Sequence, residues 1–125
     1  MNTTVPPNEY VHLDTQLALS QIGDVEAMNG MLAMLEETLS RDVPLVADLL
    51  DQGDIVGANR ILHPLKGFIP IFCRAPLCEM VAQVEALSKD AHSTSVGPAY
   101  ADLMPELNLL LDEVDAYLNG GSADH

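Results

Sequence analysis

The sequence predicts an all-α protein, an antiparallel four-helix bundle with a short extra helix before it. Apolar residues recur at intervals of three and four in nearly every segment between glycines and prolines, which is the period of an amphipathic helix. No segment shows a convincing alternation of apolar and polar residues, as a half-buried strand would. Four long amphipathic helices joined by short loops favour an antiparallel bundle, and 125 residues suffice to bury one core.

The beginning of the chain is expected to be irregular. Residues 1–12, which include two adjacent prolines, are predicted to form a lead that packs or frays. A short helix follows from about Asp14 to Gln21, with Asp14 as its N-cap. Gly23 is expected to end that helix, and Asp24 can cap the next one.

Two helices are then expected before the turn DQGD, residues 51–54. The first carries apolar residues at threes and fours, namely Val25, Met28, Met31, Leu32, Leu35 and Leu39. Methionines at 28, 31 and 34 have helical spacing, which indicates core filling rather than a binding groove. The second helix carries Val43, Val46, Leu49 and Leu50.

Asp54 can cap the helix that contains ILHPLKGFIP, residues 61–70. Pro76 suits the first position of the following helix, which runs to about Lys89. The segment DAHSTSVGP, residues 90–98, is the most loop-like stretch inside the chain.

Pro98 is expected to begin the last helix, which carries Leu103, Leu107, Leu110, Leu111, Val114 and Leu118. Pro105 should kink this helix unless it lies in the first turn. Asn-Gly-Gly at 119–121 is expected to stop it. The sequence therefore predicts one bundle domain over residues 13–119 and a flexible tail over 120–125.

Composition limits the classes of partner and site. With 19 acidic and 5 basic residues the formal charge is −14, which argues against nucleic acid and anionic membranes as partners. No apolar run approaches 20 residues and no secretory signal is present, so a cytoplasmic location is expected. Cys73 and Cys78 fit neither a zinc site nor a C-x-x-C redox motif, and both are expected to be buried. No metal site is predicted.

The helix around residue 63 has a distinct outer face. At about 100° per residue, the core face comprises Ala58, Ile61, Leu65, Ile69 and Phe72. His63 lies about 150° from that direction, so we expect it to face solvent without a fixed carboxylate partner. Lys66 lies at the flank, one turn later, within reach of the ring. The same outer surface is expected to carry Arg60, Pro64, Gly67, Ile71 and Arg74.

That outer face has two unusual properties. Arg60, Lys66 and Arg74 are three of the five basic residues of the chain, and such a cationic patch on an acidic protein suggests that an anion binds there. Exposed apolar side chains beside Gly67 form a low-relief area suited to a docking partner. A neutral imidazole has one nucleophilic nitrogen, so His63 could accept and release a phosphoryl group while nearby cations offset its charge.

The segment HPLKG, residues 63–67, resembles the H-x-L-K-G motif of histidine-containing phosphotransfer (HPt) domains of bacterial two-component phosphorelays. Residues 13–67 resemble the family's usual order of Leu-Asp, Gly-Asp, a long helix, a Gly-Asp turn and the histidine helix. Residues 75–87 resemble the helix that follows. The likeness covers about residues 13–89, and the final helix fits the expected bundle.

The resemblance implies a phosphoryl carrier in signal transduction, with no kinase activity and no cofactor of its own. His63 would form phosphohistidine at Nε2, Lys66 would assist transfer, and Gly67 would give the partner clearance. The implied partners are receiver domains of response regulators or hybrid histidine kinases, whose aspartate and Mg²⁺ supply the other half of the reaction. We expect the carrier to be a monomer.

The chain departs from the family pattern after the motif. The family usually has small residues and then a glycine near the position of Cys73, whereas this chain has FIPIFC at 68–73. Pro64 and Pro70 each remove a backbone donor, so bending is expected there, and Pro70 is counted with the partner-binding residues. The other histidines, His12, His92 and His125, are expected to be ordinary surface residues.

Two other functions fit part of the pattern. An HPt-like bundle could bind a receiver or kinase without transferring phosphate, although His63, Lys66 and Gly67 are all present. The chain could instead be the dimerisation and phosphoacceptor part of a histidine kinase. In that family an acidic residue normally follows the histidine, whereas Pro64 follows it here.

Overall fold

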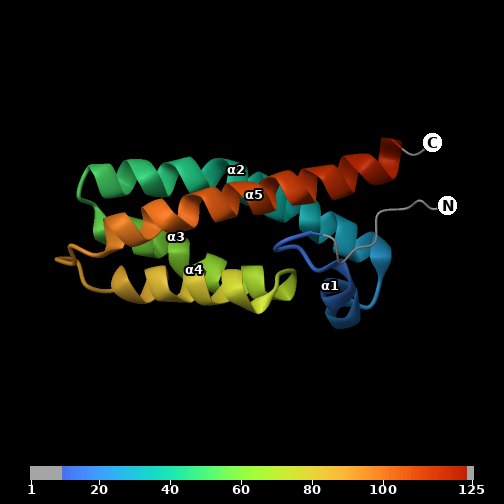
Figure 1. Cartoon of the computed structure of the whole chain (residues 1–125), viewed down its shortest axis with the longest axis horizontal. Coiled ribbons are helices and arrows are strands. Elements are labelled where there is room, and N and C mark those ends of the chain that lie inside the picture. The colour runs from blue at the N-terminus through green and yellow to red at the C-terminus, as the bar shows by residue number, and fades with distance from the viewer. Residues whose placement is uncertain (1–9, 124–125) are drawn as a thin grey trace.

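The computed structural model describes residues 10–123, and these form an all-α bundle (Figure 1). Residues 1–9 of the expected lead, and residues 124 and 125 of the expected tail with His125, lie outside the described residues. The helices are α1 (Thr15–Ile22), α2 (Val25–Asp51), α3 (Ile55–Phe68), α4 (Ala75–Leu87) and α5 (Val96–Ala123), and a 3₁₀ turn, η2 (Ile69–Ile71), follows α3.

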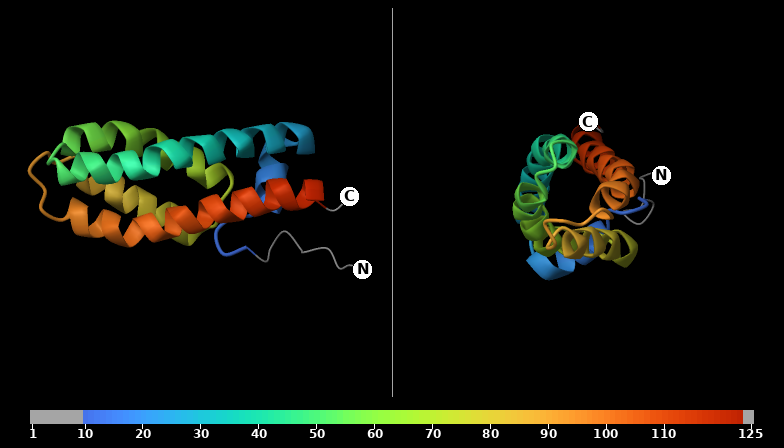
Figure 2. Two further views of the ribbon diagram at one scale, coloured as in Figure 1. Left: turned by 90° about the horizontal axis from the view of Figure 1, so that it is seen from above. Right: turned by 90° about the vertical axis from the view of Figure 1, so that its left-hand side faces the viewer.

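Four of these helices surround one core. α2 packs against α3 and α5, and α4 packs against the same two helices, so the four close into the ring seen end-on in Figure 2. α2 and α5 are about twice as long as α3 and α4. α1 packs on α2 and η2, beside the end of α3 and the beginning of α4 (Figure 1). The predicted bundle with a short extra N-terminal helix is confirmed.

Three aspartates begin helices as the sequence predicts. The side chains of Asp14, Asp24 and Asp54 accept the backbone N–H three residues later, at distances of 3.0, 2.8 and 2.9 Å. Such caps satisfy N–H groups that have no partner within the helix. Gly23 has a φ of 86°, a conformation that glycine adopts without a steric penalty, and it ends α1.

The two helices expected between residues 24 and 51 are a single helix, so that prediction is wrong. Leu35, Leu39, Val43 and Val46 are all buried and continue one stripe at intervals of three and four. These four residues lie on one face of a continuous helix, so a single helix can bury all of them and the apolar pattern requires no break between Leu39 and Val43. Pro44 lies inside α2 and is exposed, so it removes one backbone hydrogen bond without ending the helix.

The limits of the later helices differ from the predictions by small amounts. α4 begins at Ala75, so Pro76 is its second residue, and Pro98 lies in the first turn of α5. Pro105 lies inside α5. α5 continues to Ala123, so the expected stop at 119–121 is wrong. Glycine costs about 1 kcal/mol in a helix interior, which disfavours a helix without forbidding it.

The core draws on every helix, and its fully buried side chains include Ala18, Leu32, Leu39, Leu62, Leu77 and Leu107. Two expectations about it are wrong. Met28 is buried and Met31 is half-buried, but Met34 is 59% exposed because it lies outside the apolar stripe of α2. Cys73 is buried as expected, whereas Cys78 is only half-buried, and both are free thiols.

The segment just before α1 is held at several points. The backbone N–H of Asp14 donates to the carbonyl of Phe72 at 2.7 Å, and that of Arg74 donates to the carbonyl of His12 at 2.9 Å. The imidazole Nε2 of His12 lies 2.8 Å from a carboxylate oxygen of Glu106. His12 is therefore buried, and the prediction of an ordinary surface histidine is wrong. His92 is exposed in the loop before α5, as expected.

Candidate functional site

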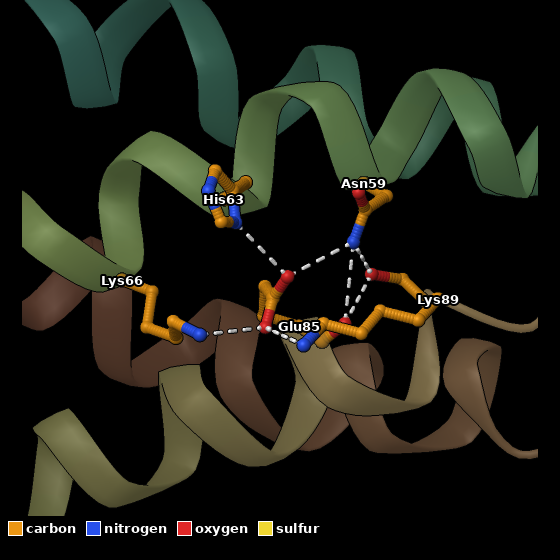
Figure 3. Close-up of polar contacts among 6 residues, drawn as sticks. Asn59, His63, Lys66, Glu85 and Lys89 are labelled. Carbon is orange, nitrogen blue, oxygen red and sulfur yellow. Dashed lines mark hydrogen bonds and ion pairs between the residues drawn. The ribbon is translucent and has the colours of Figure 1, made fainter.

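His63 lies on the side of the bundle formed by α3 and α4. Its side chain is 67% exposed, as the face assignment predicts. Facing it from α4 is Glu85, whose side chain is only 1% exposed. His63 Nδ1 lies 3.2 Å from Glu85 Oε2 (Figure 3). The expectation that the histidine has no fixed carboxylate partner is therefore wrong.

This partner could not be predicted from the helix of His63, because it is 22 residues away along the chain, on a different helix. A signal for it does exist in the sequence of α4. Leu77, Val81, Val84 and Ser88 are the buried residues at threes and fours, and Glu85 lies beside Val84 on the same buried side. An ionisable residue within a core-facing stripe is seldom buried without partners, so it marks a polar contact inside the bundle.

Glu85 collects donors from both helices. Lys66 Nζ lies 3.1 Å and Lys89 Nζ 3.8 Å from Oε1 (Figure 3). Asn59 Nδ2 donates to Oε2 at 3.2 Å, one turn before His63 on α3. The side-chain amide of Asn59 also donates to Ser88 Oγ at 2.8 Å and to the backbone carbonyl of Glu85 at 3.3 Å, so Asn59 joins α3 to α4.

The charge state of Glu85 follows from these contacts. Burial by itself raises the pKa of the Glu85 carboxyl, but hydrogen bonds from Lys66, His63 and Asn59 outweigh burial and lower that pKa below its usual range. The group is therefore a carboxylate at neutral pH, balanced by two lysine ammonium groups. Lys89 and Asn59 were not among the predicted site residues, and both belong to this cluster.

Around His63, three of the predicted partner-binding residues lie on the exposed side of α3 or η2 as expected: Arg60, Pro64 and Pro70. Gly67 is exposed as well, and a methyl group added there would have no atom within 4 Å outside its own helix backbone. Lys66 is half-buried, at the flank, as predicted. The surface next to the histidine is therefore open and low.

Two predicted members of this surface lie elsewhere. Ile71 is half-buried and packs against the core, because the chain advances about 120° per residue in a 3₁₀ turn instead of about 100°. Arg74 is the N-cap of α4, 11 residues before Glu85, which corresponds to about 16 Å along the helix. The prediction of three basic residues around His63 is therefore wrong for Arg74. A different cation, Lys89, lies near Glu85 from the turn that follows α4.

An open groove of about 410 Å³ runs between α2 and α3, beside the same surface. Pro64, Ile61, Leu65 and Phe68 line its apolar part, and Arg60 lines it too. Pro64 directly follows His63, so the groove begins next to the histidine. Ile61 was expected in the core, but it is half-buried because it faces this groove.

Other site classes find no support within residues 10–123. No group of three or more histidine, cysteine or acidic side chains in this range could hold a metal ion. None of the helices described is both long and apolar enough to cross a membrane.

Comparison with known proteins returned no match: no family model, no curated protein and no solved structure is similar to the chain at a significant level. The function proposed below therefore rests on the residues of α3 and α4 and on the HPLKG motif.

Proposed function

We propose that the chain is an HPt-type phosphoryl carrier that accepts a phosphoryl group on His63 from the aspartate of one receiver domain and passes it to another. One observation carries the proposal. The His63 ring is mostly exposed, with Nδ1 directed at the carboxylate of Glu85 and the ring edge that bears Nε2 directed away from it (Figure 3). This arrangement fixes the ring and leaves one nitrogen accessible to a partner.

The surroundings suit transfer between proteins. Lys66 lies one turn after His63 and contacts the same carboxylate, and an ammonium group at this position would offset the charge that develops on a phosphoryl group during transfer. Gly67 presents no side chain beside His63, so a second backbone can approach closely. The phosphoryl-transfer chemistry needs no pocket in this chain, because the partner would bring the phosphoaspartate and its Mg²⁺.

The proposed partner is a receiver domain, either of a response regulator or of a hybrid histidine kinase. The α2–α3 groove supports docking there, because its apolar lining begins at Pro64 and could bury an apolar side chain of the partner. With a net charge of −14, most of the remaining surface is negative and would repel an acidic partner. The region of Arg60 and Lys66 is therefore the more favourable place for such a partner to dock.

The proposal is tested by incubating the wild-type chain with a panel of phosphorylated receiver domains and measuring acid-labile phosphate on it. His63→Gln is expected to abolish labelling and to remain folded, since the ring faces solvent. His92→Gln is the matched control, because His92 is also exposed but lies in the loop before α5 and not on α3. Label that persists in His63→Gln would contradict the proposal.

The same experiment distinguishes the interaction-only alternative. Binding to a receiver without any label on wild type would favour a bundle that docks but does not transfer phosphate. In that case the bulky segment FIPIFC, 68–73, is the first place to look, because Phe68 lines the groove beside His63.

A further inference from the structure

A second open groove, of about 360 Å³, lies between the last turns of α2 and the first turns of α5. Its large lining side chains are Leu50, Tyr100 and Met104, and its rim includes the exposed Gly97 and Ala101. We call it the α2–α5 groove. Because α2 and α5 pack on each other as α3 and α4 do, this groove is on the other side of the bundle from the candidate site (Figure 2).

The floor of the α2–α5 groove is held by a buried hydrogen bond. The Tyr100 hydroxyl donates to the backbone carbonyl of Val43 at 2.7 Å, and Tyr100 is only 3% exposed. The rim is bare in contrast, since a methyl group added at Gly97 would meet no atom within 4 Å. A fixed apolar floor with a bare rim allows the backbone of another chain to approach closely.

The end of α2 beside this groove carries negative charge without a compensating cation. Asp48 and Asp51 are exposed, and Asp51 lines the groove. The last turn of α2, residues 48–51 of the described chain, contains no basic residue, and no ion pair within residues 10–123 includes either aspartate. The C-terminus of a helix is the negative end of its dipole, so acidic residues there are unfavourable and lysine or arginine is preferred. A cation supplied by a partner would therefore stabilise this end of the helix.

We propose that the α2–α5 groove is a second docking surface, which takes a lysine or arginine side chain of a partner protein. The aliphatic stem of that side chain would lie on Tyr100 and Met104, and its charged group would pair with Asp51 at the negative end of α2. Apolar lining and unbalanced negative charge meet at this one place, and a long basic side chain is complementary to both.

The shape of the groove favours part of a protein over a small cation such as a polyamine. Sites for small molecules enclose most of the ligand surface, whereas this groove is open along its bare rim. It would cover one side of a side chain and leave room for the backbone that carries it. A partner bound here would also leave the surface around His63 free for a receiver, and this consequence alone rests on the proposed function.

The test is a titration of the ¹⁵N-labelled full chain with N-acetyl-arginine-N′-methylamide, a single blocked arginine residue, followed in ¹H–¹⁵N spectra. Saturable shifts are expected at the backbone amides of Gly97 and Ala101. The citrulline analogue of this probe has nearly the same shape without the charge, and it should bind several-fold more weakly. Equal binding of the two probes would overturn the proposal, because the groove would then not discriminate charge.

Two variants separate the charge from the groove. Asp51→Asn should weaken binding of the arginine probe to the level of the citrulline analogue. Ala101→Leu fills the groove at an exposed position and should weaken binding of both probes. Asp112→Asn is the matched control, because Asp112 is exposed and lies 11 residues beyond Ala101 on α5, about 16 Å along the helix. If Asp51→Asn binds the arginine probe as tightly as Asp112→Asn does, the proposal is overturned.

Titration with spermidine tests the small-cation alternative. If spermidine shifts the same amides at lower concentration and Ala101→Leu does not weaken its binding, the end of α2 binds a polyamine and the proposal is overturned. His63→Gln should bind the arginine probe as the wild type does, because the groove is on the opposite side of the bundle. Absence of label on His63 would therefore contradict only the proposed function, and absence of probe binding would contradict only the second docking surface.

Discussion

The carboxylate of Glu113 accepts the backbone N–H of His12 at 3.0 Å, which ties the segment before α1 to the middle of α5. The same carboxylate accepts the N–H groups of Val11 at 2.6 Å and Leu13 at 3.0 Å. Leu13 also pairs with Cys73, just after η2. Glu113 therefore anchors a segment that in turn holds the end of the histidine helix.

Replacement of Glu113 by Ala should lower the free energy of unfolding by about 3 kcal/mol, because three backbone N–H groups lose a buried charged acceptor. Urea denaturation of wild type and variant measures the change. Asp112→Ala is the matched control: Asp112 is the exposed neighbour on α5, and its loss should change stability by less than about 0.5 kcal/mol. Equal effects of the two substitutions would contradict this role of Glu113.

Local features of the fold could be predicted because they depend on residues close together in the sequence. The caps at Asp14, Asp24 and Asp54 and the exposed face of His63 follow from spacing alone. The continuity of α2 was also encoded locally, in the unbroken phase of its buried residues, and the prediction of two helices did not follow that phase past Leu39.

The partners of buried polar groups could not be predicted in the same way. Glu85 meets His63 across two helices, and Glu113 meets His12 at a separation of 101 residues. Such contacts depend on how far each helix is rotated and shifted against its neighbour, which hydrophobic periodicity does not specify. The error at Arg74 has a related cause, since the face assignment extended a helix beyond Phe68, where the α-helix ends.

The substitution Gly67→Ala distinguishes the effect of this glycine on the stability of the fold from its proposed role in receiver docking. A methyl group at Gly67 has no neighbour within 4 Å, so the substitution should stabilise the fold by about 0.5–1 kcal/mol, as alanine is the better helix former. Transfer from a phosphorylated receiver should nevertheless slow several-fold, because the added methyl group hinders docking beside His63. Thermal denaturation and transfer rates give the two readings.

Gly30→Ala is the control for that experiment. Gly30 also lies within a helix, and a methyl group added there would meet no atom within 4 Å, but it is on α2, outside the candidate site. It should gain similar stability with an unchanged transfer rate. If Gly67→Ala transfers as fast as Gly30→Ala, clearance at Gly67 is not needed.

Lys66→Ala should slow phosphoryl transfer about tenfold without preventing receiver binding, because the ammonium group stabilises charge in the transfer state rather than the complex. Single-turnover transfer and a binding isotherm with unphosphorylated receiver separate the two effects. Lys89→Ala is the comparator: its Nζ is farther from Glu85, 3.8 Å against 3.1 Å, so its effect should be smaller. An unchanged rate in Lys66→Ala would remove Lys66 from the mechanism.

The lowered pKa of Glu85 predicts a specific dependence of stability on pH. Hydrogen bonds from Lys66, His63 and Asn59 outweigh burial and hold this pKa below its ordinary value of 4.5 in the folded chain. A folded-state pKa below the unfolded one stabilises the protein above the unfolded value, and that stabilisation is lost as the pH falls through the folded value. Wild type should therefore exceed Glu85→Gln in stability at neutral pH, and the difference should narrow below about pH 4.5.

Urea midpoints measured from about pH 7 to about pH 3 test this dependence, because the difference between the two proteins isolates Glu85 from the other carboxyl groups. Glu79→Gln, an exposed substitution on the same helix, should show no comparable difference at neutral pH. A gap between wild type and Glu85→Gln that stays constant over the whole range would mean that the ionised form of Glu85 is not the one the fold stabilises.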